Sequence, residues 1–290
     1  MSTAPSQLTL EQRLKRFAPA RITTPLGEIE YRQAGNGQQA VTHVLLHGIG
    51  SGSGSWLMQL EAAAITESAH VLAWEAPGYG NSSPVLPDVP DASDYASRVW
   101  AWLDALGVMQ PVTLVGHSLG ALMAARAAVQ RPERIKRLVL LSPAQGYARA
   151  SEEERAKKLG DRLSNLNTLG VQGMAQKRGA AMLSPNADAE RVAYVQSIMA
   201  QVHPAGYTQA SHLLVGGDLL TDVAQVRCPI AVGSGRADTI TPMAGCQKVA
   251  EVAGVAWTDL GDAGHACAVD AAAGVNQLLG LMNHNEKVSA

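Results

Sequence analysis

The feature that most constrains this chain is a regular alternation, from Ile22 onward, of short β-branched or leucine-rich runs with longer alanine-rich stretches. A hairpin turning at 25–27 is predicted within 22–35, and further strands at 42–48, 70–78, 111–120, 137–143, 228–235 and 256–261. Helices are predicted between the strands, at 56–64, 91–107, 121–131, 242–253 and 269–282. Strands that alternate with helices form a mostly parallel sheet covered on both faces, so the pattern predicts an α/β fold.

The alternation stops between residues 144 and 225, where no convincing strand occurs. Helical runs are predicted there at 151–166, 171–183 and 187–199. We therefore expect one core, made of residues 1–143 and 226–290, with a helical cap of residues 144–225 inserted between strands 6 and 7. Its loops would lie at the carboxyl ends of those strands, where open α/β sheets bind ligands.

Charge and composition exclude several classes of function. The 23 Lys and Arg residues nearly balance the 25 Asp and Glu residues of the 290-residue chain, which predicts neither a nucleic-acid partner nor a membrane surface. No apolar stretch is long enough for a membrane span or a secretory signal, so we expect a soluble, cytoplasmic protein. The three cysteines, Cys228, Cys246 and Cys267, are too scattered for a disulfide framework or a metal site and are interpreted as packing residues.

The first twenty residues contain a helix signal. Thr9 and Gln12 have the spacing of a capping box, and Leu10, Leu14 and Phe17 recur at helical intervals. We expect a short amphipathic helix that lies on the main body or on a partner subunit, which leaves a homodimer open.

The pattern that carries chemistry is G-x-S-x-G, at residues 116–120, between a predicted strand and an alanine-rich helix. A sharp strand-to-helix turn crowds the backbone, and glycines at positions 116 and 120 leave room for Ser118 to stand exposed above the sheet. The pattern alone is weak evidence, and a helix N-cap serine would be the structural alternative. In this context it predicts a nucleophilic serine.

Partners for Ser118 follow in the order acid, then base, that this kind of site requires. Asp238 comes directly after one predicted strand and His265 directly after the last one. Asp259 and Asp262 compete for the role of the acid, but Asp262 lies in the same loop as His265, a poor position for a carboxylate that must approach from a neighbouring strand.

Two backbone N–H groups are expected to stabilise the negative charge that develops on an attacked carbonyl oxygen. One is that of Leu119, which follows the nucleophile and begins a helix. The other is that of Ile49, in the loop that follows the strand ending near His47. Because main-chain groups supply these donors, the side chains of the loop remain free to shape a pocket.

These residues resemble the α/β-hydrolase superfamily, and within it the 3-oxoadipate enol-lactonase-like and haloperoxidase-like esterases and lactonases. The resemblance runs from about Ile22 to Met282. It includes the His47-Gly48 pair, the segment 76–82, the G-x-S-x-G turn at 116–120, which we call the elbow, and the Gly264-His265 pair. It implies the α/β-hydrolase fold, with an eight-stranded sheet, a cap between strands 6 and 7, and no cofactor. The chain departs from the pattern at Glu75, where many members have aspartate, so the hydrogen bonds of that loop are expected to differ.

The leading hypothesis is a cofactor-independent serine hydrolase that cleaves a small carboxylic ester or an enol-lactone through an acyl-enzyme. A carbon–carbon bond hydrolase acting on a meta-cleavage-type diketone would use the same residues, but such enzymes usually show G-N-S-M-G-G where this chain has GHSLGA. A small-molecule receptor on the same fold is the alternative from another class. The presence of all three expected reacting residues, Ser118, Asp238 and His265, argues against a receptor.

Substrate contacts are the least constrained prediction. With 28 glycines and one phenylalanine, the pocket must be shaped by Trp, Tyr, Met and Leu. Trp56, His117 and Met174 are the candidates for substrate contact. The basic residues of the cap could include one that pairs with a substrate carboxylate, although a solvated position is the usual one for such a residue. No metal-binding spacing such as H-E-x-x-H occurs in the sequence.

Overall fold

The computed structural model describes residues 8–281 and contains one eight-stranded sheet. The strand order is β1-β2-β4-β3-β5-β6-β7-β8. The strands are β1 (Ala20–Thr24), β2 (Gly27–Gly35), β3 (His43–Leu46), β4 (His70–Trp74), β5 (Val112–His117), β6 (Ile135–Leu141), β7 (Ile230–Ser234) and β8 (Trp257–Asp259). The predicted α/β-hydrolase sheet is confirmed.

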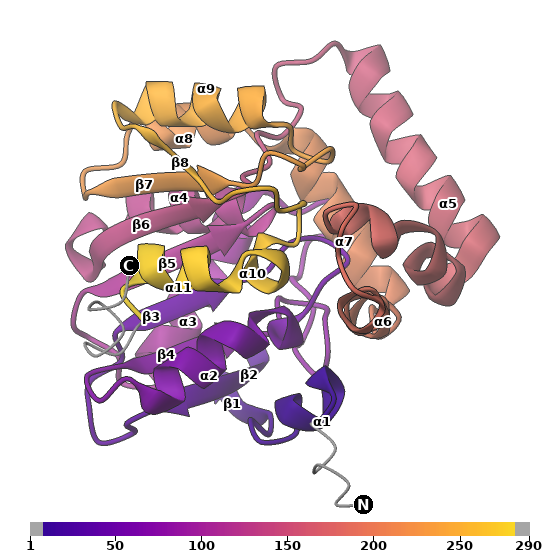
Figure 1. The fold of residues 1–290 in the computed structure, drawn as a ribbon. Helices are drawn as coiled ribbons and strands as arrows, with labels where there is room; N and C mark the ends of the chain where they lie inside the picture. The colour runs from indigo at the N-terminus through magenta and orange to yellow at the C-terminus, as the bar shows by residue number, and fades with distance from the viewer. Residues whose placement is uncertain (1–7, 282–290) are drawn as a thin grey trace, which may run out of the picture.

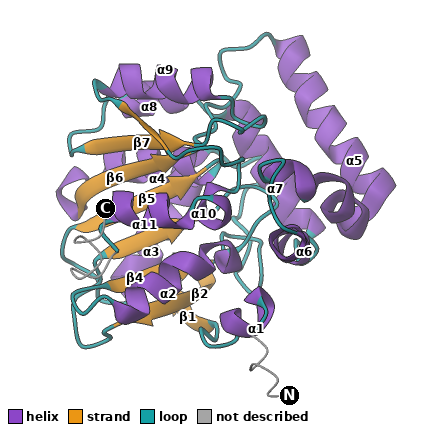
Figure 2. Cartoon of the chain, in the orientation of Figure 1, coloured by secondary structure: helices purple, strands orange, loops and turns teal. Residues whose placement is uncertain are grey.

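Strand direction explains where the site can form. The β1–β2 hairpin joins the sheet antiparallel to β4, and all pairs from β4 to β8 are parallel. The parallel strands consequently end at one edge of the sheet, at which Figure 2 shows a group of helices. β5 lies between β3 and β6, and its burial on both faces fits its apolar sequence.

Helices cover both faces of the sheet. Figure 1 shows α2 and α11 in front of it and α3 and α4 behind it. The core helices are α2 (Leu57–Ile65), α3 (Ala92–Ala105), α4 (Gly120–Gln130), α9 (Met243–Ala253), α10 (Cys267–Asp270) and α11 (Ala272–Leu279), with 3₁₀ turns η1 (Ser53–Trp56) and η2 (Pro132–Arg134). Each face buries its own apolar cluster, so the core is formed by two layers of helices around one sheet.

Residues 144–225 connect β6 to β7 and contain no strand, as expected. Their elements are α5 (Glu152–Arg178), η3 (Ala180–Met182), α6 (Ala189–Met199), α7 (Pro204–Gly216) and α8 (Leu219–Val223). The sequence predicted separate helices at 151–166 and 171–183, but the structure joins them in α5, with a kink at Gly170, whose φ is 62°. The sequence did not predict α7 or α8. We call residues 144–225 the helical insertion.

The N-terminal helix α1 (Leu10–Leu14) begins with the predicted capping box, in which the Thr9 side chain accepts from the backbone of Gln12. The helix lies on the main body. Its Leu10 N–H donates to Glu190 of α6, and Arg13 pairs with Glu61 of α2. α1 therefore joins the core to the helical insertion. No helix among residues 8–281 is long and apolar enough to cross a membrane.

Candidate active site

Ser118 occupies the sharp turn between β5 and α4. Its φ of 53° lies in the left-handed region that a side chain rarely adopts. The flanking glycines make this turn possible: a Cβ on Gly116 would lie 2.4 Å from the carbonyl oxygen of Gly120, and one on Gly120 would lie 2.3 Å from that of Leu46. The G-x-S-x-G pattern is thus a steric requirement of this backbone.

Asp238 and His265 meet beside this turn, although 27 residues separate them in the chain. The His265 Nδ1 lies 3.0 Å from Asp238 Oδ2 and 3.2 Å from Oδ1. An Nδ1–H that donates to the carboxylate leaves Nε2 as the proton-accepting nitrogen of the neutral ring. The two side chains are almost completely buried, so the ring orientation is fixed.

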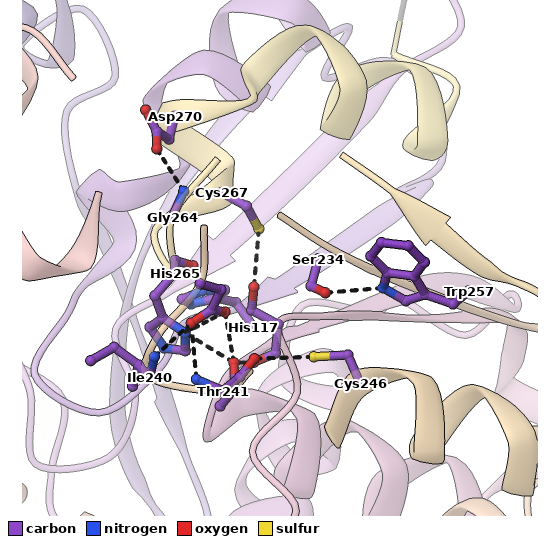
Figure 3. A network of polar contacts seen from close by, with 12 residues as sticks. His117, Ser234, Ile240, Thr241, Cys246, Trp257, Gly264, His265, Cys267 and Asp270 are labelled. Carbon is purple, nitrogen blue, oxygen red and sulfur yellow. Dashed lines mark hydrogen bonds and ion pairs between the residues drawn. The ribbon is translucent and has the colours of Figure 1, made fainter. Parts of the chain in front are cut away.

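Thr241 holds the carboxylate from the other side. Its backbone N–H donates to Asp238 Oδ1 at 2.9 Å, and its hydroxyl lies 2.8 Å from Oδ2 and 3.1 Å from His265 Nδ1. Burial opposes ionisation of Asp238, but the hydrogen bonds from His265 and Thr241 outweigh it and lower the pKa of Asp238 to about 2. Figure 3 shows Thr241, His265 and His117 within this network.

The competing acids Asp259 and Asp262 take no part in this network. Both pair with Arg236 on the surface, at 2.5 Å and 2.8 Å. Of the three candidate acids, Asp238 is the one that contacts His265. Thr241 was not predicted as part of the site, although its position, three residues after an acid and immediately before a helix, is a local signal for such a hydrogen bond.

The expected donors Ile49 and Leu119 are placed close to Ser118. Ile49 lines the same cavities as Ser118, and Leu119 is the residue before the first turn of α4. The two loops touch, because a Cβ on Gly48 would lie 2.8 Å from the Cβ of Ser118. In the described part of the chain, no hydrogen bond uses the N–H of Ile49 or of Leu119. Both donors are available to a ligand.

The loop that contains Ile49 is held by buried polar groups. His47 Nε2 accepts from the N–H of Ala76, and its Nδ1 lies 2.9 Å from the Gly48 carbonyl. Burial lowers the pKa of His47 to about 4, which keeps the ring neutral. Glu75 accepts from the N–H and hydroxyl of Ser53, at 3.0 Å and 2.5 Å. The longer side chain at position 75 therefore reaches a serine of the Gly- and Ser-rich loop.

The loop of His265 is attached to the helical insertion. The Asp270 carboxylate accepts from the N–H of Gly264 and from that of Ser184, both at 2.7 Å. The Ala266 N–H also donates to the carbonyl of Met182. Figure 3 shows the Gly264–Asp270 contact beside His265. No local pattern indicated this role of Asp270, because one of its two partners, Ser184, lies 86 residues away in the chain.

Two cavities meet at Ser118 and His265, and Ile49 and Met182 also line both. The smaller one, of about 30 Å³, is mainly apolar, with walls from α6 and α10. The larger one, of about 270 Å³, extends between the insertion and the loops that follow β6 and β7. Its polar side chains include Gln145, Arg162 and Arg178. Such a cleft can hold a molecule whose two halves differ in polarity.

The three predicted substrate contacts are placed differently. Trp56 is fully buried and lines neither cavity, so that prediction is wrong: its ring packs edge-on against His117, with centroids 6.3 Å apart. His117 lines the smaller cavity, and its Nε2 lies 2.7 Å from the carbonyl oxygen of His265. Met174 lines a neighbouring cavity of about 20 Å³, together with Ile49.

The cysteines do not offer a second nucleophile. Burial raises the pKa of Cys246 to about 11 and that of Cys267 to about 12, so both remain thiols at neutral pH. Cys228 is partly buried, and its pKa is also raised. Between residues 8 and 281 there is no group of three or more His, Cys, Asp or Glu side chains placed to hold a metal ion.

Known proteins resemble this arrangement at the level of sequence and of fold. A family model described as "Alpha/beta hydrolase family" matches residues 44–278. An (E)-2-((N-methylformamido)methylene)succinate hydrolase of Acinetobacter baylyi is 28% identical over 215 residues, which cover 72% of this chain and 75% of that protein. A (Lyso)-N-acylphosphatidylethanolamine lipase of Mus musculus is 30% identical over 103 residues, covering 34% of this chain and 29% of the lipase. The matched region is thus under a third of that lipase.

Among solved structures, the enol-lactonase from Burkholderia xenovorans LB400 superposes with a TM-score of 0.77. The superposition covers 90% of this chain and 98% of the enol-lactonase, at 21% sequence identity. At that identity the likeness establishes a shared fold.

Proposed function

This chain belongs to the alpha/beta hydrolase family, and from this premise we propose that it is a serine hydrolase that cleaves a small carboxylic ester or lactone. Ser118 is the nucleophile, His265 the general base and Asp238 the group that orients the base. The observation that carries the proposal is that Ser118 and His265 line the same two cavities, while Nδ1 of His265 is bound to Asp238.

The proposed reaction uses each group at a stated atom. His265 Nε2 takes the proton of the Ser118 hydroxyl as Oγ attacks the carbonyl carbon, and the Asp238 carboxylate stabilises the resulting imidazolium. The N–H groups of Ile49 and Leu119 donate to the oxyanion. The tetrahedral intermediate collapses, the leaving alcohol takes the proton from His265, and an acyl-enzyme remains. Water, deprotonated by His265, then releases the acid and restores Ser118.

The division of labour follows the proposed domains. Residues 1–143 and 226–290 supply the three reacting side chains, and residues 144–225 form a cap that supplies Met182, Val195 and Arg162 to the cavity walls. We place the choice of substrate in this cap. The substrate is a small molecule, since the larger cavity has a volume of about 270 Å³.

The test is covalent labelling combined with ester hydrolysis. A fluorophosphonate should modify Ser118, as located by peptide mass spectrometry, because only an activated serine reacts at a useful rate. The Ser118→Ala variant should lose hydrolysis of 4-nitrophenyl esters by about three orders of magnitude or more. The exposed Ser164→Ala serves as the control. An active Ser118→Ala protein, or a wild type that cleaves only carbon–carbon bonds, would contradict the proposal.

A further inference from the structure

The inward side of helix α5 is unusually basic. Arg155, Lys158 and Arg162 recur every three or four residues and are partly buried, whereas the acidic Asp161 and the run 152–154 are exposed. Lys158 lies over the ring of Tyr147, at 5.5 Å from its centroid. A helix that only packs on a protein presents a continuous apolar stripe on this side. Here the stripe is interrupted by three cations, which suggests a role other than packing.

Two arginines of α5 reach the larger cavity. Arg162 and Arg178 both line it, together with Ser118 and His265, and no Asp or Glu between residues 8 and 281 does. Among the described residues, the side chains that line the cavity next to Ser118 thus include two positive charges and no negative one. This arrangement attracts anions and strengthens their binding where water is excluded.

Neither guanidinium has a protein partner in the described structure. Other arginines of the insertion form ion pairs, Arg149 with Asp218 and Arg191 with Asp188. No ion pair or hydrogen bond from Arg162 or Arg178 occurs within residues 8–281, and Nη1 of Arg162 is buried without an acceptor. A buried donor without an acceptor is unfavourable, so a ligand that supplies an acceptor would be bound favourably at this position.

We propose, building on the serine hydrolase function proposed above, that Arg162 and Arg178 bind an oxyanion group of the substrate, a carboxylate or a phosphate. The planar guanidinium presents paired donors that match either group. The substrate then has two unlike halves. One half is short and apolar and enters the smaller cavity, and the other extends through the larger cavity and ends in the anionic group, with the ester carbonyl at Ser118.

The experiment compares pairs of esters that differ by the anionic group alone. Mono-4-nitrophenyl glutarate and 4-nitrophenyl valerate place the difference on the acyl half. The pair 4-acetoxybutyrate and butyl acetate places it on the alcohol half. We expect kcat/KM to favour the charged member of at least one pair by roughly 10- to 100-fold, the range of a charge-assisted hydrogen bond.

Variants assign this preference to the two arginines. Arg162→Gln and Arg178→Gln should each reduce the ratio of charged to neutral kcat/KM, and the double variant should bring it close to one. Arg178→Lys, which keeps the charge, should retain part of it. Arg191→Gln, in the same insertion but outside the cavity, is the matched control. Unfolding temperatures show that the variants are folded, and inhibition by free glutarate or inorganic phosphate tells which oxyanion is bound.

The outcomes separate the two proposals. If both members of every pair are hydrolysed equally well, the anion site is wrong and the hydrolase function stands. If the double variant keeps the full preference, the two arginines are not the site. If no ester is hydrolysed and Ser118 is not labelled, the hydrolase function fails and this inference fails with it.

Discussion

Helices α7 and α5 belong to the same insertion but are attached to the molecule in opposite ways. Eight of the thirteen residues of α7 are buried, against three of the twenty-seven residues of α5. Figure 1 shows α7 next to the sheet and α5 on the far side of the insertion. The insertion therefore has a firmly packed floor, α7, and a more loosely attached wall, α5. The wall contains Arg162 and Arg178.

The attachment of α7 is specific. Its Gly206 lies against Gly78, so closely that a Cβ on Gly206 would be 2.0 Å from the carbonyl oxygen of Gly78. Its Gln209 side chain donates to the carbonyl oxygens of Val85 and Pro87, both at 2.9 Å. The position of α7 relative to the turn that follows β4 is therefore set by backbone contact as well as by apolar packing.

The largest effect on stability is expected from breaking that contact. Gly206→Ala should lower the free energy of unfolding by about 2–3 kcal/mol, because neither backbone can move without disturbing the packing behind it. Gly216→Ala, in the last turn of the same helix with open space around it, is the control. Urea unfolding measures both. Equal stability of the two variants would show that α7 is not held at Gly206.

The stability contributed by Glu75, which directly follows β4 and precedes the turn that α7 contacts, should depend on pH. Burial raises the pKa of Glu75 from 4.5 to about 7, against the hydrogen bonds from Ser53. Between these pH values the folded protein binds more protons than the unfolded chain, so this group's contribution to stability falls as the pH rises. Relative to Glu75→Gln, the wild type should lose about 2 kcal/mol of stability over this range.

The comparison with Glu75→Gln isolates this group from its neighbour. His47, whose pKa burial lowers to about 4, gives a slope of opposite sign, because the folded protein there binds fewer protons than the unfolded chain. That slope is present in both proteins, so the difference between them reports mainly on Glu75, whose carboxylate lies 3.7 Å from His47 Nε2. Parallel stability curves from chemical unfolding at several pH values would contradict the expectation.

The smallest effects are expected in α5, and they have opposite signs. Gly170→Ala should cost about 1–2 kcal/mol, because the kink needs a positive φ that alanine resists, although the added Cβ would meet no atom within 4 Å in the described part of the chain. Gly160→Ala, ten residues earlier in the regular part of the helix and also in open space, should stabilise by about 0.5–1 kcal/mol. Thermal unfolding checks both signs. Stabilisation by Gly170→Ala would mean that the kink is not required.

The same contrast explains what the sequence could predict. The elbow at Ser118 was predictable because its glycines are required by contacts within a few residues and with the adjacent strand. Asp238 and His265 were predictable because parallel strands end at one edge of the sheet, so the order of residues along the chain becomes proximity in space. The N-terminal helix was predictable from its capping box and from the helical spacing of Leu10, Leu14 and Phe17.

Other features depend on contacts that no local pattern encodes. The sequence 204–216 is rich in small and polar residues and buried on more than one side, so it lacks the single apolar stripe by which a helix is recognised. The burial of Trp56 was missed because a tryptophan near a catalytic loop can face a cavity or the core. The sequence of α5, with Arg155, Lys158 and Arg162, resembled that of a solvent-exposed helix, because the sequence does not show which side of the helix faces the protein.

The contacts of Asp270 link the chemistry to the insertion. One carboxylate accepts from Gly264 in the histidine loop and from Ser184 in the segment that follows α5. Either segment can move away only if its own hydrogen bond to this carboxylate breaks, so the carboxylate couples the positions of the two segments. A ligand that displaces the segment after α5 therefore acts, through Asp270, on the loop that carries His265.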